Sequence, residues 1–295
     1  MIIVITGPTA VGKTKLSVEI AKKINGEIIN ADSTQVYQDL NIATAKIKEE
    51  EKEDITHHLF DIKDIKDDYS VYDYQKDCRN TIDKILKKGK VPIIVGGTGL
   101  YIKSALFNYD FENYKRKDYS NLSLDELYNK VSLLDDNNTI HKNNRKRLEI
   151  ALSYMEDTNS KFSAKEKNST LIYDALFIGL TTKREILYDR INKRVDLMFE
   201  EGLLEEAKQI YDKKIRTKAV MTPIGYKELF EHFDGNISLE EAKEKIKQNS
   251  RRYAKRQYTW NRHQLDIKWF EVDFDNFDNT VSEVLEYIGN KNDER

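Results

Sequence analysis

Three short stretches of this chain carry residue types that could handle an anionic substrate. The first, Gly7–Thr14, reads GPTAVGKT and matches G-x-x-x-x-G-K-[ST] between an apolar run and a helical pattern. Its glycines let the backbone wrap an anion, and its N–H groups point at that anion from the start of a helix. Lys13 adds a charge, and Thr14 offers a hydroxyl to a magnesium ion that bridges two phosphates. The motif predicts a site for a diphosphate or a triphosphate, and it does not identify the group that is attached to the phosphates.

The second stretch is NADSTQVY at 30–37, which begins in the polar end of an expected strand at 26–33. Ligands of a doubly wound sheet bind at the carboxyl ends of its strands, so Asp32 is expected beside the phosphate loop. A carboxylate there could accept a proton from a nucleophile, hold magnesium through water, or cap the following segment.

The third stretch, GGTGLY at 96–101, ends another expected strand at the same edge. Two glycines before Thr98 would let the backbone and a hydroxyl approach a ligand closely. The alternative is an ordinary strand-to-helix turn. Because three such loops converge on one edge, we favour a ligand site.

The elements that would position these loops alternate between strands and helices. Apolar runs at 2–5 and within 91–106 predict buried strands, and 72–90 predicts a helix ending near Gly89. Such alternation is typical of an α/β fold with a P-loop-type, doubly wound parallel sheet. We expect this core at 1–109 and 171–295.

Residues 110–170 interrupt this pattern and are expected to form a helical insertion domain. A capping box, Ser123 to Glu126, opens one helix there, and 143–155 predicts a second. In the second part of the core, 183–211 reads as one long helix and 238–246 begins another with a capping box.

Composition excludes several classes of protein. Of 295 residues, 39% are hydrophobic, so a core can form, and a net charge of −2 means that any polyanion must bind a local patch. The single cysteine, Cys78, excludes a disulfide framework within the chain. No apolar run approaches the roughly 20 residues that span a bilayer, and no leader is recognised at the start. We therefore expect a cytoplasmic protein that makes no membrane contact.

Several motifs together resemble the bacterial tRNA dimethylallyltransferases, the tRNA isopentenyltransferase or IPP transferase family. They occur in the family's order along nearly the whole chain, and the match is weakest at 108–170. They are GPTAVGKT, DSTQVY, ATAK at 43–46 where the family has GTAK, HHLFDI at 57–62, GGTGLY, RINKRVDLMFEEGLLEE at 190–206, IGYKEL at 224–229 and YAKRQYTW at 253–260.

The resemblance implies transfer of a dimethylallyl group from dimethylallyl diphosphate to N6 of adenosine 37, in tRNAs reading codons that begin with U. It implies diphosphate binding by Gly7, Pro8, Thr9, Ala10, Val11, Gly12, Lys13 and Thr14, with Mg2+ on Thr14. Asp32 would act as the base, and Thr98 would donate to a diphosphate oxygen near the breaking bond. The implied tRNA contacts are Asp32, Ser33, Thr34, Gln35, Thr98, Lys146, Arg147, Arg251, Lys255, Arg256 and Gln257, the insertion gripping the anticodon stem-loop.

A basic segment at 245–262 could bind RNA, because it has seven Lys and Arg residues and no acid. On an ideal helix an apolar stripe, Ile246, Tyr253, Gln257 and Trp260, shares one face. A cationic edge, Arg251, Lys255, Tyr258 and Arg262, shares the other. If Gln257 reads a base edge, the helix must end or bend near it. The alternative is a solvated basic helix.

Two further pairs leave alternatives open. Arg190 and Arg194, one helical turn apart, could form salt bridges with Asp196 and nearby acids or clamp a diphosphate. The pair His57 and His58 suggests a metal, but without a third ligand nearby we favour a structural role.

Three rival functions share some of these features. A P-loop nucleotide or nucleoside kinase would have the same loop and carboxylate, but it would not need the acid-free basic helix. A prenyltransferase acting on free AMP would not need the insertion. A non-catalytic RNA-binding switch would not need Asp32, Lys13, Thr14 and Thr98 together. Nothing in the sequence requires more than a monomer.

Overall fold

The computed structural model describes residues 1–109, 111, 114–167 and 170–293. They fall into two compact units, Met1–Leu106 with Tyr173–Arg295, and Phe107–Ile172. Within the described part of the chain, no helix is both long and apolar enough to cross a membrane.

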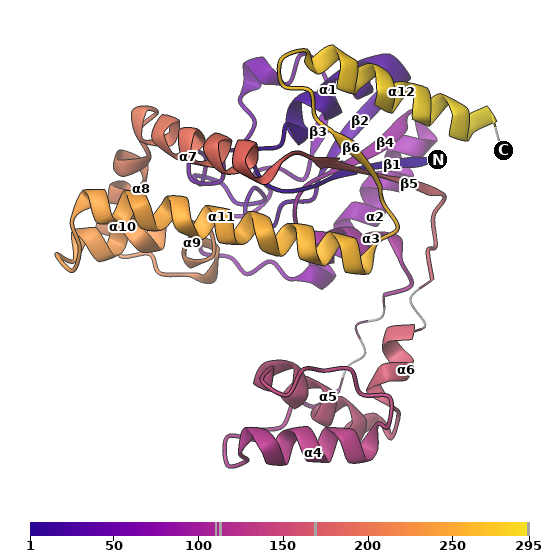
Figure 1. The fold of residues 1–295 in the computed structure, drawn as a ribbon, viewed down its shortest axis with the longest axis vertical. Helices are drawn as coiled ribbons and strands as arrows, with labels where there is room; N and C mark the ends of the chain where they lie inside the picture. The colour runs from indigo at the N-terminus through magenta and orange to yellow at the C-terminus, as the bar shows by residue number, and fades with distance from the viewer. Residues whose placement is uncertain (110, 112–113, 168–169, 294–295) are drawn as a thin grey trace. The chain divides into compact units, whose positions relative to one another are not determined.

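The first unit is built on a six-stranded, wholly parallel sheet of order β3-β2-β4-β1-β5-β6 (Figure 1). Its strands are β1 (Ile2–Thr6), β2 (Gly26–Asn30), β3 (His57–His58), β4 (Val91–Val95), β5 (Ala175–Thr181) and β6 (Lys268–Glu271). The central strand β1 is buried along its whole length, as its β-branched sequence predicts. The expected P-loop-type, doubly wound α/β fold is confirmed.

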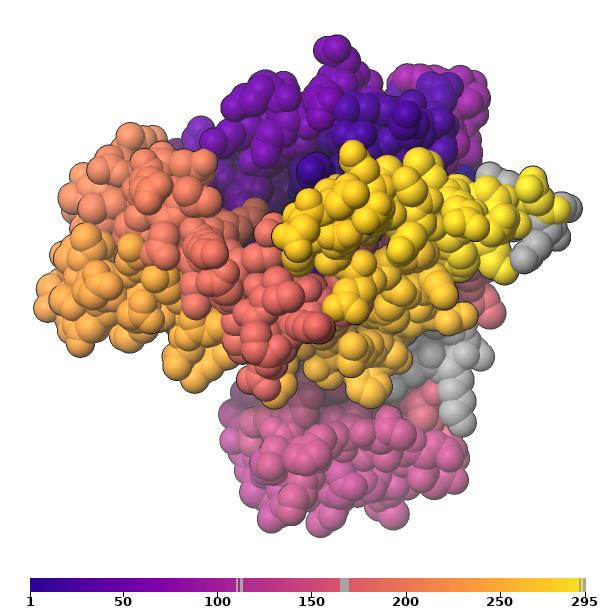
Figure 2. All heavy atoms as spheres, turned by 45° about the horizontal axis from the view of Figure 1, so that its top comes forward, coloured from indigo at the N-terminus to yellow at the C-terminus, as the bar shows by residue number. Residues whose placement is uncertain are grey.

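Helices cover both faces of this sheet. They are α1 (Lys13–Ile24), α2 (Val71–Lys87), α3 (Gly99–Leu106), α7 (Arg184–Glu200), α8 (Leu203–Asp212), α9 (Lys218–Met221), α10 (Tyr226–Phe233), α11 (Leu239–Gln264) and α12 (Phe277–Asp293), with a 3-10 turn, η1 (Glu49–Glu51). Helices α1 and α12 lie together on one face, and α2, α3 and α11 lie on the other (Figure 1). Figure 2 shows the yellow α12 against the indigo N-terminal residues.

The main core joins the sheet to α1 and α12. Leu16 and Ile20 of α1 pack with Val284 and Ile288 of α12 in one buried cluster, together with Ile3 and other strand residues. Helices cover both faces of the sheet, so a ligand cannot bind on either face. The loops that follow the carboxyl ends of the strands can still form a site.

The expectation of one long helix at 183–211 is wrong. The helix is interrupted at Gly202, which separates α7 from α8. That glycine has φ 100 and stands immediately before α8, where a left-handed residue costs little only if it lacks a side chain. The second strand also stops earlier than expected, at Asn30. The Asn30 side chain accepts a hydrogen bond from Asp32 N at 2.8 Å and donates to Asp32 O at 3.1 Å, which turns the chain.

The histidine pair stabilises the edge of the sheet. His58 Nε2 lies 2.7 Å from Glu27, a carboxylate only 2% exposed that also pairs with Lys88 and Lys90. Burial alone would raise the pKa of Glu27, but hydrogen bonds from Lys90, His58 and Lys88 lower it to about 2. Among the described residues, no group of three or more His, Cys, Asp or Glu side chains could hold a metal ion.

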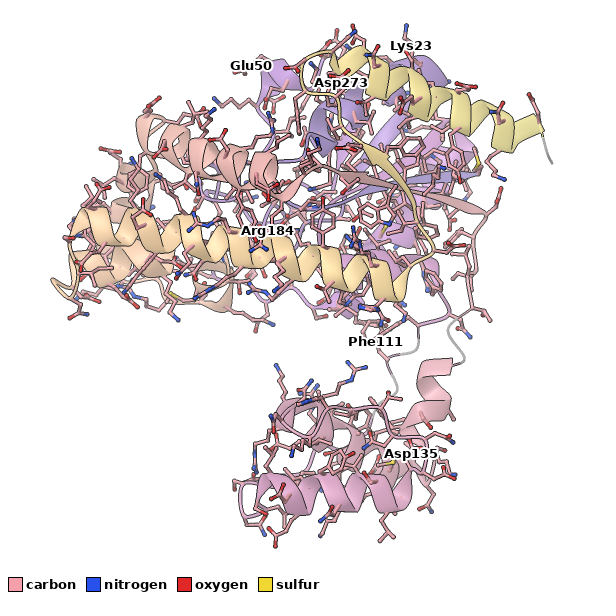
Figure 3. All side chains as sticks on the ribbon, in the orientation of Figure 1. Lys23, Glu50, Phe111, Asp135, Arg184 and Asp273 are labelled. Carbon is pink, nitrogen blue, oxygen red and sulfur yellow. The ribbon has the colours of Figure 1, made fainter. Side chains whose placement is uncertain are left out.

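The second unit is helical and has a core of its own. It contains α4 (Leu124–Leu134), α5 (Arg145–Thr158) and α6 (Phe162–Lys167), and Leu127, Leu148 and Leu152 are fully buried in it. The capping box expected at Ser123 is present, since its hydroxyl accepts from Glu126 N. Asp135 is labelled in Figure 3, and it is 2% exposed and accepts two hydrogen bonds of 2.7 Å from Ser163.

Gly96 lies where the loop after β4 approaches the loop after β2, and Gly289 in α12 provides a matched control. A Cβ on Gly96 would lie 2.2 Å from the backbone of Ala31, whereas one on Gly289 in α12 would meet nothing within 4 Å. We expect Gly96→Ala to lower the free energy of unfolding by about 1–3 kcal/mol, and the matched change Gly289→Ala to raise it by up to about 1 kcal/mol. Urea unfolding of both variants measures this difference. Equal stability of Gly96→Ala and the unchanged protein would contradict the close approach.

Candidate active site

The phosphate loop joins β1 to α1 in the conformation that its glycines allow. Gly7 and Gly12 have φ 138 and 99, and a Cβ on Gly7 would lie 2.6 Å from Leu180 O. Helix α1 starts at Lys13, and Gly12 supplies no side-chain cap. The first backbone N–H groups of α1 are therefore left for an external anion.

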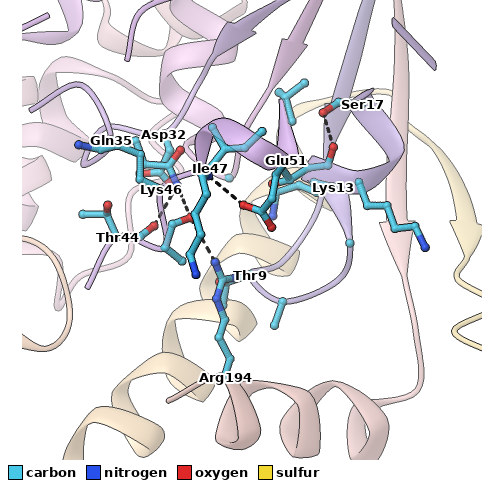
Figure 4. A pocket seen from close by; sticks show the side chains of 18 of the residues that line it. Thr9, Lys13, Ser17, Asp32, Gln35, Thr44, Lys46, Ile47, Glu51 and Arg194 are labelled. Atoms are coloured by element: carbon cyan, nitrogen blue, oxygen red, sulfur yellow. Dashed lines mark hydrogen bonds between the residues drawn. The ribbon is translucent and has the colours of Figure 1, made fainter. Parts of the chain in front are cut away.

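A cavity of about 990 Å³ opens over this loop (Figure 4). It is lined by the phosphate loop, by the ends of β2 and β4, by the segment 41–51 and by α7 and α11. The predicted site residues that line it are Thr9, Ala10, Val11, Gly12, Lys13, Thr14, Asp32, Gln35 and Gln257. The predicted site residues of the first unit that do not line it are Gly7, Pro8, Ser33, Thr34, Thr98, Arg251, Lys255 and Arg256.

Two cations meet in the cavity. Lys13 Nζ donates to Pro8 O at 2.7 Å, and Arg194 of α7 donates to Thr9 Oγ1 at 3.3 Å and to Ala45 O at 3.4 Å. Burial and then the positive charge of Arg194 lower the pKa of Lys13 to about 7, against the raising effect of Asp32. The site therefore already concentrates positive charge before any anion is bound.

Arg190, one turn before Arg194, also contacts the phosphate loop. Its Nε donates to Ala10 O at 3.0 Å, and its guanidinium stacks 3.9 Å from the centroid of the Phe274 ring. Among the described residues neither Arg190 nor Arg194 forms a salt bridge with Asp196 or a nearby acid, and Asp196 pairs instead with Lys243 and Lys247 of α11.

Asp32 combines a capping role with a free oxygen. Its Oδ1 accepts from Thr34 N at 2.9 Å and from Thr34 Oγ1 at 2.7 Å, the Asx turn that a capping aspartate makes. Within the part of the chain that the structure describes, Oδ2 receives no hydrogen bond. One carboxylate oxygen is thus fixed by the turn, and the other remains available to a ligand in the cavity.

Thr98, in the loop that follows β4, is hydrogen-bonded to the loop that follows β2. Its Oγ1 accepts from Ser33 N at 3.1 Å and lies 3.4 Å from Ser33 Oγ, and its N–H donates to Ala31 O at 3.1 Å. Gln35, farther along the same loop, donates through Nε2 to Thr44 O and Ala45 O.

Sequence reasoning missed how the segment 41–46 becomes a wall of the cavity. The Glu206 carboxylate of α8 accepts from the backbone N–H groups of Asn41, Ile42 and Ala43 at 2.9–3.2 Å, and from the Tyr226 hydroxyl at 2.7 Å. Because the partners on the segment are main-chain atoms, no residue pattern in the segment signals this contact.

The inner side of α11 carries Ile246 and Gln257 as expected, but Gln257 makes polar contacts there. Both side chains are buried, and both polar atoms of the Gln257 amide bind backbone of the loops. The helix does not end near Gln257 but continues to Gln264. Tyr253, absent from our predicted site, lines the cavity, and burial raises the pKa of its hydroxyl, so it stays neutral.

The expected cationic edge of α11 is correct only in part. Lys255, Arg256 and Arg262 are exposed. Tyr258 instead lies against the sheet, its hydroxyl 2.7 Å from Thr181 Oγ1 and 3.2 Å from Thr182 N. Arg251 donates to Asn192 of α7 at 2.5 Å, so its guanidinium already has a partner in the protein.

In the second unit, Lys146 and Arg147 occupy the exposed first turn of α5. Arg145 beside them turns inward, donating to Leu122 O at 2.9 Å and Tyr119 O at 2.7 Å. It also pairs with Glu149 at 2.8 Å. Arg145 therefore holds its own unit together, and Lys146 and Arg147 supply the exposed basic positions.

Known proteins match this chain over almost its full length. The model of the IPP transferase family matches residues 35–264. The tRNA dimethylallyltransferases of Anoxybacillus flavithermus and Geobacillus kaustophilus are 48% and 45% identical, covering 98% of this chain and 96% of each relative.

Solved structures match it as well. The tRNA isopentenylpyrophosphate transferase of Bacillus halodurans has a TM-score of 0.79 at 41% identity, covering 99% of this chain and 97% of that one. A eukaryotic dimethylallyltransferase acting on tRNA has a TM-score of 0.84 at 33% identity, covering 98% of this chain and 78% of that one. With a phosphate loop, a carboxylate and an arginine-lined cavity in the matching fold, this chain belongs to the IPP transferase family.

Proposed function

We propose that this chain modifies tRNA by transferring a dimethylallyl group from dimethylallyl diphosphate to N6 of adenosine 37. The acceptors would be tRNAs that read codons beginning with U, and diphosphate would leave. The observation that carries the proposal is one cavity that joins the phosphate loop, the cations Lys13 and Arg194, and the free oxygen of Asp32. The kinase alternative is not favoured, because the matching relatives and structures are transferases that act on tRNA.

The reaction breaks the bond between C1 of the dimethylallyl group and the diphosphate oxygen, and it forms a bond between C1 and N6. Charge that develops on the leaving diphosphate is neutralised by the amides of the phosphate loop, Lys13, Arg190 and Arg194. Thr98 follows Gly97 of the cavity lining, and its hydroxyl would exchange its long contact with Ser33 Oγ for a hydrogen bond to the diphosphate oxygen near the breaking bond.

The N6 proton goes to Asp32. The lone pair of adenine N6 is delocalised into the ring, so a base near N6 is needed to release it. The Asx turn to Thr34 supports this role, because it fixes the carboxylate while Oδ2 faces no protein donor among the described residues.

Magnesium is a further part of the proposal. Thr14 is exposed at the start of α1, and among the described residues its hydroxyl makes no hydrogen bond. A hydroxyl together with substrate phosphates and water suits Mg2+, which usually keeps few protein ligands. The ion would add positive charge beside the diphosphate.

The RNA contacts divide between the two units. Lys255 and Arg256 of α11 and Lys146 and Arg147 of α5 are exposed cations suited to phosphates of an anticodon stem-loop. The target base must leave its stack to reach a cavity, as in other enzymes that modify a base. The proposal needs only a monomer, since one chain lines the cavity, and it places the reaction in the cytoplasm with tRNA.

We predict that Asp32→Asn lowers turnover by roughly 10²–10⁴-fold. The amide oxygen can still accept from Thr34, so the turn is kept, but it cannot take the N6 proton. Single-turnover prenylation of an anticodon stem-loop RNA measures the rate, and equilibrium binding checks that RNA and dimethylallyl diphosphate still bind.

The matched control is Asp39→Asn, the same chemical change at an exposed residue with φ 62, a conformation that asparagine tolerates. It should keep normal turnover. If Asp32→Asn turned over at the normal rate, Asp32 would not be the base.

The lowered pKa of Lys13 predicts that substrate binding is linked to protons. In the free protein this lysine is charged below its pKa of about 7 and neutral above it. The bound diphosphate favours the charged form, so binding at pH 8 should take up roughly one proton, and affinity should fall as pH rises above 7.

Calorimetry at pH 8 in two buffers of different ionisation enthalpy measures this uptake. Lys13→Arg should abolish it, because an arginine stays charged. Equal proton uptake by Lys13→Arg and the unchanged protein would assign the proton to another group.

A further inference from the structure

Two buried amide side chains lie one turn apart on the inner side of α11, Gln257 at 5% exposed and Asn261 at 1%. Gln257 Oε1 accepts from Thr9 N at 2.8 Å, and its Nε2 donates to Gly97 O at 3.2 Å. One side chain therefore bridges the phosphate loop after β1 and the glycine loop after β4.

Asn261, one turn farther along α11, contacts the end of β1. Its Nδ2 donates to Thr6 Oγ1 at 3.2 Å, and Thr6 Oγ1 donates to Gly96 O at 3.0 Å. Asn261 therefore holds the end of β1, and it reaches the glycine loop only through Thr6.

The glycines of the second loop make room for this helix. A Cβ on Gly97 would lie 1.9 Å from Gln257 Nε2, and one on Gly99 would lie 2.0 Å from the Trp260 ring. The backbone of the loop therefore rests directly against α11, and the position of the helix sets the position of the loop.

Both bridged loops line the cavity, the phosphate loop with Thr9 and the glycine loop with Gly97. Thr9 also accepts from Arg194, on the side of the diphosphate. Gly97 precedes Thr98, whose hydroxyl binds Ser33 beside Asp32. Gln257 therefore contacts the phosphate loop directly at Thr9, and it is linked to the loop of Asp32 through Gly97, Thr98 and Ser33.

We infer that Gln257 is a positioning residue, which holds the phosphate loop and the glycine loop at the spacing that prenyl transfer requires. Its amide suits this task because it both accepts and donates, so each loop is fixed through a different atom. This inference rests on the proposed transfer reaction. It assigns to Gln257 a role within the protein where our sequence analysis assigned tRNA binding.

The two faces of this part of α11 then have separate tasks. Lys255 and Arg256 are exposed and suited to RNA, and Gln257 beside them is buried against the loops. Substitutions on the two faces should therefore affect different binding steps.

The test compares Gln257→Met, which keeps the volume and loses both hydrogen bonds, with Gln257→Glu, which can accept from Thr9 but cannot donate to Gly97. Binding of dimethylallyl diphosphate is measured by calorimetry without RNA, and binding of an anticodon stem-loop RNA by fluorescence anisotropy. We expect Gln257→Met to weaken prenyl diphosphate binding or slow turnover by roughly 10- to 100-fold, with RNA affinity within about two-fold of normal.

A second readout needs no ligand. Hydrogen exchange at the Thr9 amide should accelerate in Gln257→Met and stay slow in Gln257→Glu, because only the carboxylate still accepts from it. This measurement tests the bridge even if the chain proves to bind another diphosphate. It also separates failure of the inference from failure of the proposed function.

Lys255→Met is the matched control on the outer face. It should weaken RNA binding and leave both Thr9 exchange and RNA-free binding of dimethylallyl diphosphate unchanged. The inference is overturned if Gln257→Met leaves Thr9 exchange and prenyl diphosphate binding normal, or if it weakens only RNA binding, as a base-reading residue would.

Discussion

The structure depends on keeping two cations, Lys13 and Arg194, close together in one cavity, where among the described residues no carboxylate forms an ion pair with either. Lys13 and Arg194 repel each other, and burial and this repulsion lower the pKa of Lys13 to about 7. Protein carbonyl groups hold them meanwhile, Pro8 O for the lysine and Ala45 O for the arginine. Such an arrangement is costly in the free protein and favourable once a diphosphate enters, so the surrounding elements must prevent the loops from relaxing apart.

That restraint comes from parts of the chain far from the phosphate loop in sequence. Helix α11 ties the loop to the glycine loop through Gln257, and α7 contacts it through Arg190. The Glu206 carboxylate of α8 binds the backbone N–H groups of residues 41–43. Two residues farther along, the Ala45 carbonyl accepts a hydrogen bond from Arg194. The position of the loops around the cavity is therefore set by contacts from α7, α8 and α11, in addition to the phosphate-loop motif itself.

The sequence predicted what local patterns encode. Buried β-branched strands, the phosphate motif and the capping boxes at Ser123 and Ser238 are short-range signals, and the structure contains all of them. It did not predict the break at Gly202, because one glycine in a helical pattern is compatible with a continuous helix until tertiary contacts decide. It placed Ile246 and Gln257 on the inner side of α11, where both are buried, but it did not predict the contacts of Gln257, since periodicity distinguishes faces and does not identify the partners of a buried amide. Contacts to main-chain atoms, such as those of Gln257 and Glu206, leave no pattern at the partner positions.

The grip of Glu206 on residues 41–43 has a consequence for how this wall of the cavity can evolve. The carboxylate recognises only peptide N–H groups, which every residue except proline presents alike. Side chains there can drift while the path of the chain is preserved, and Ala43 is such a position within the ATAK motif. The path of this wall therefore depends on one acid of α8 more than on the side chains of residues 41–43 themselves.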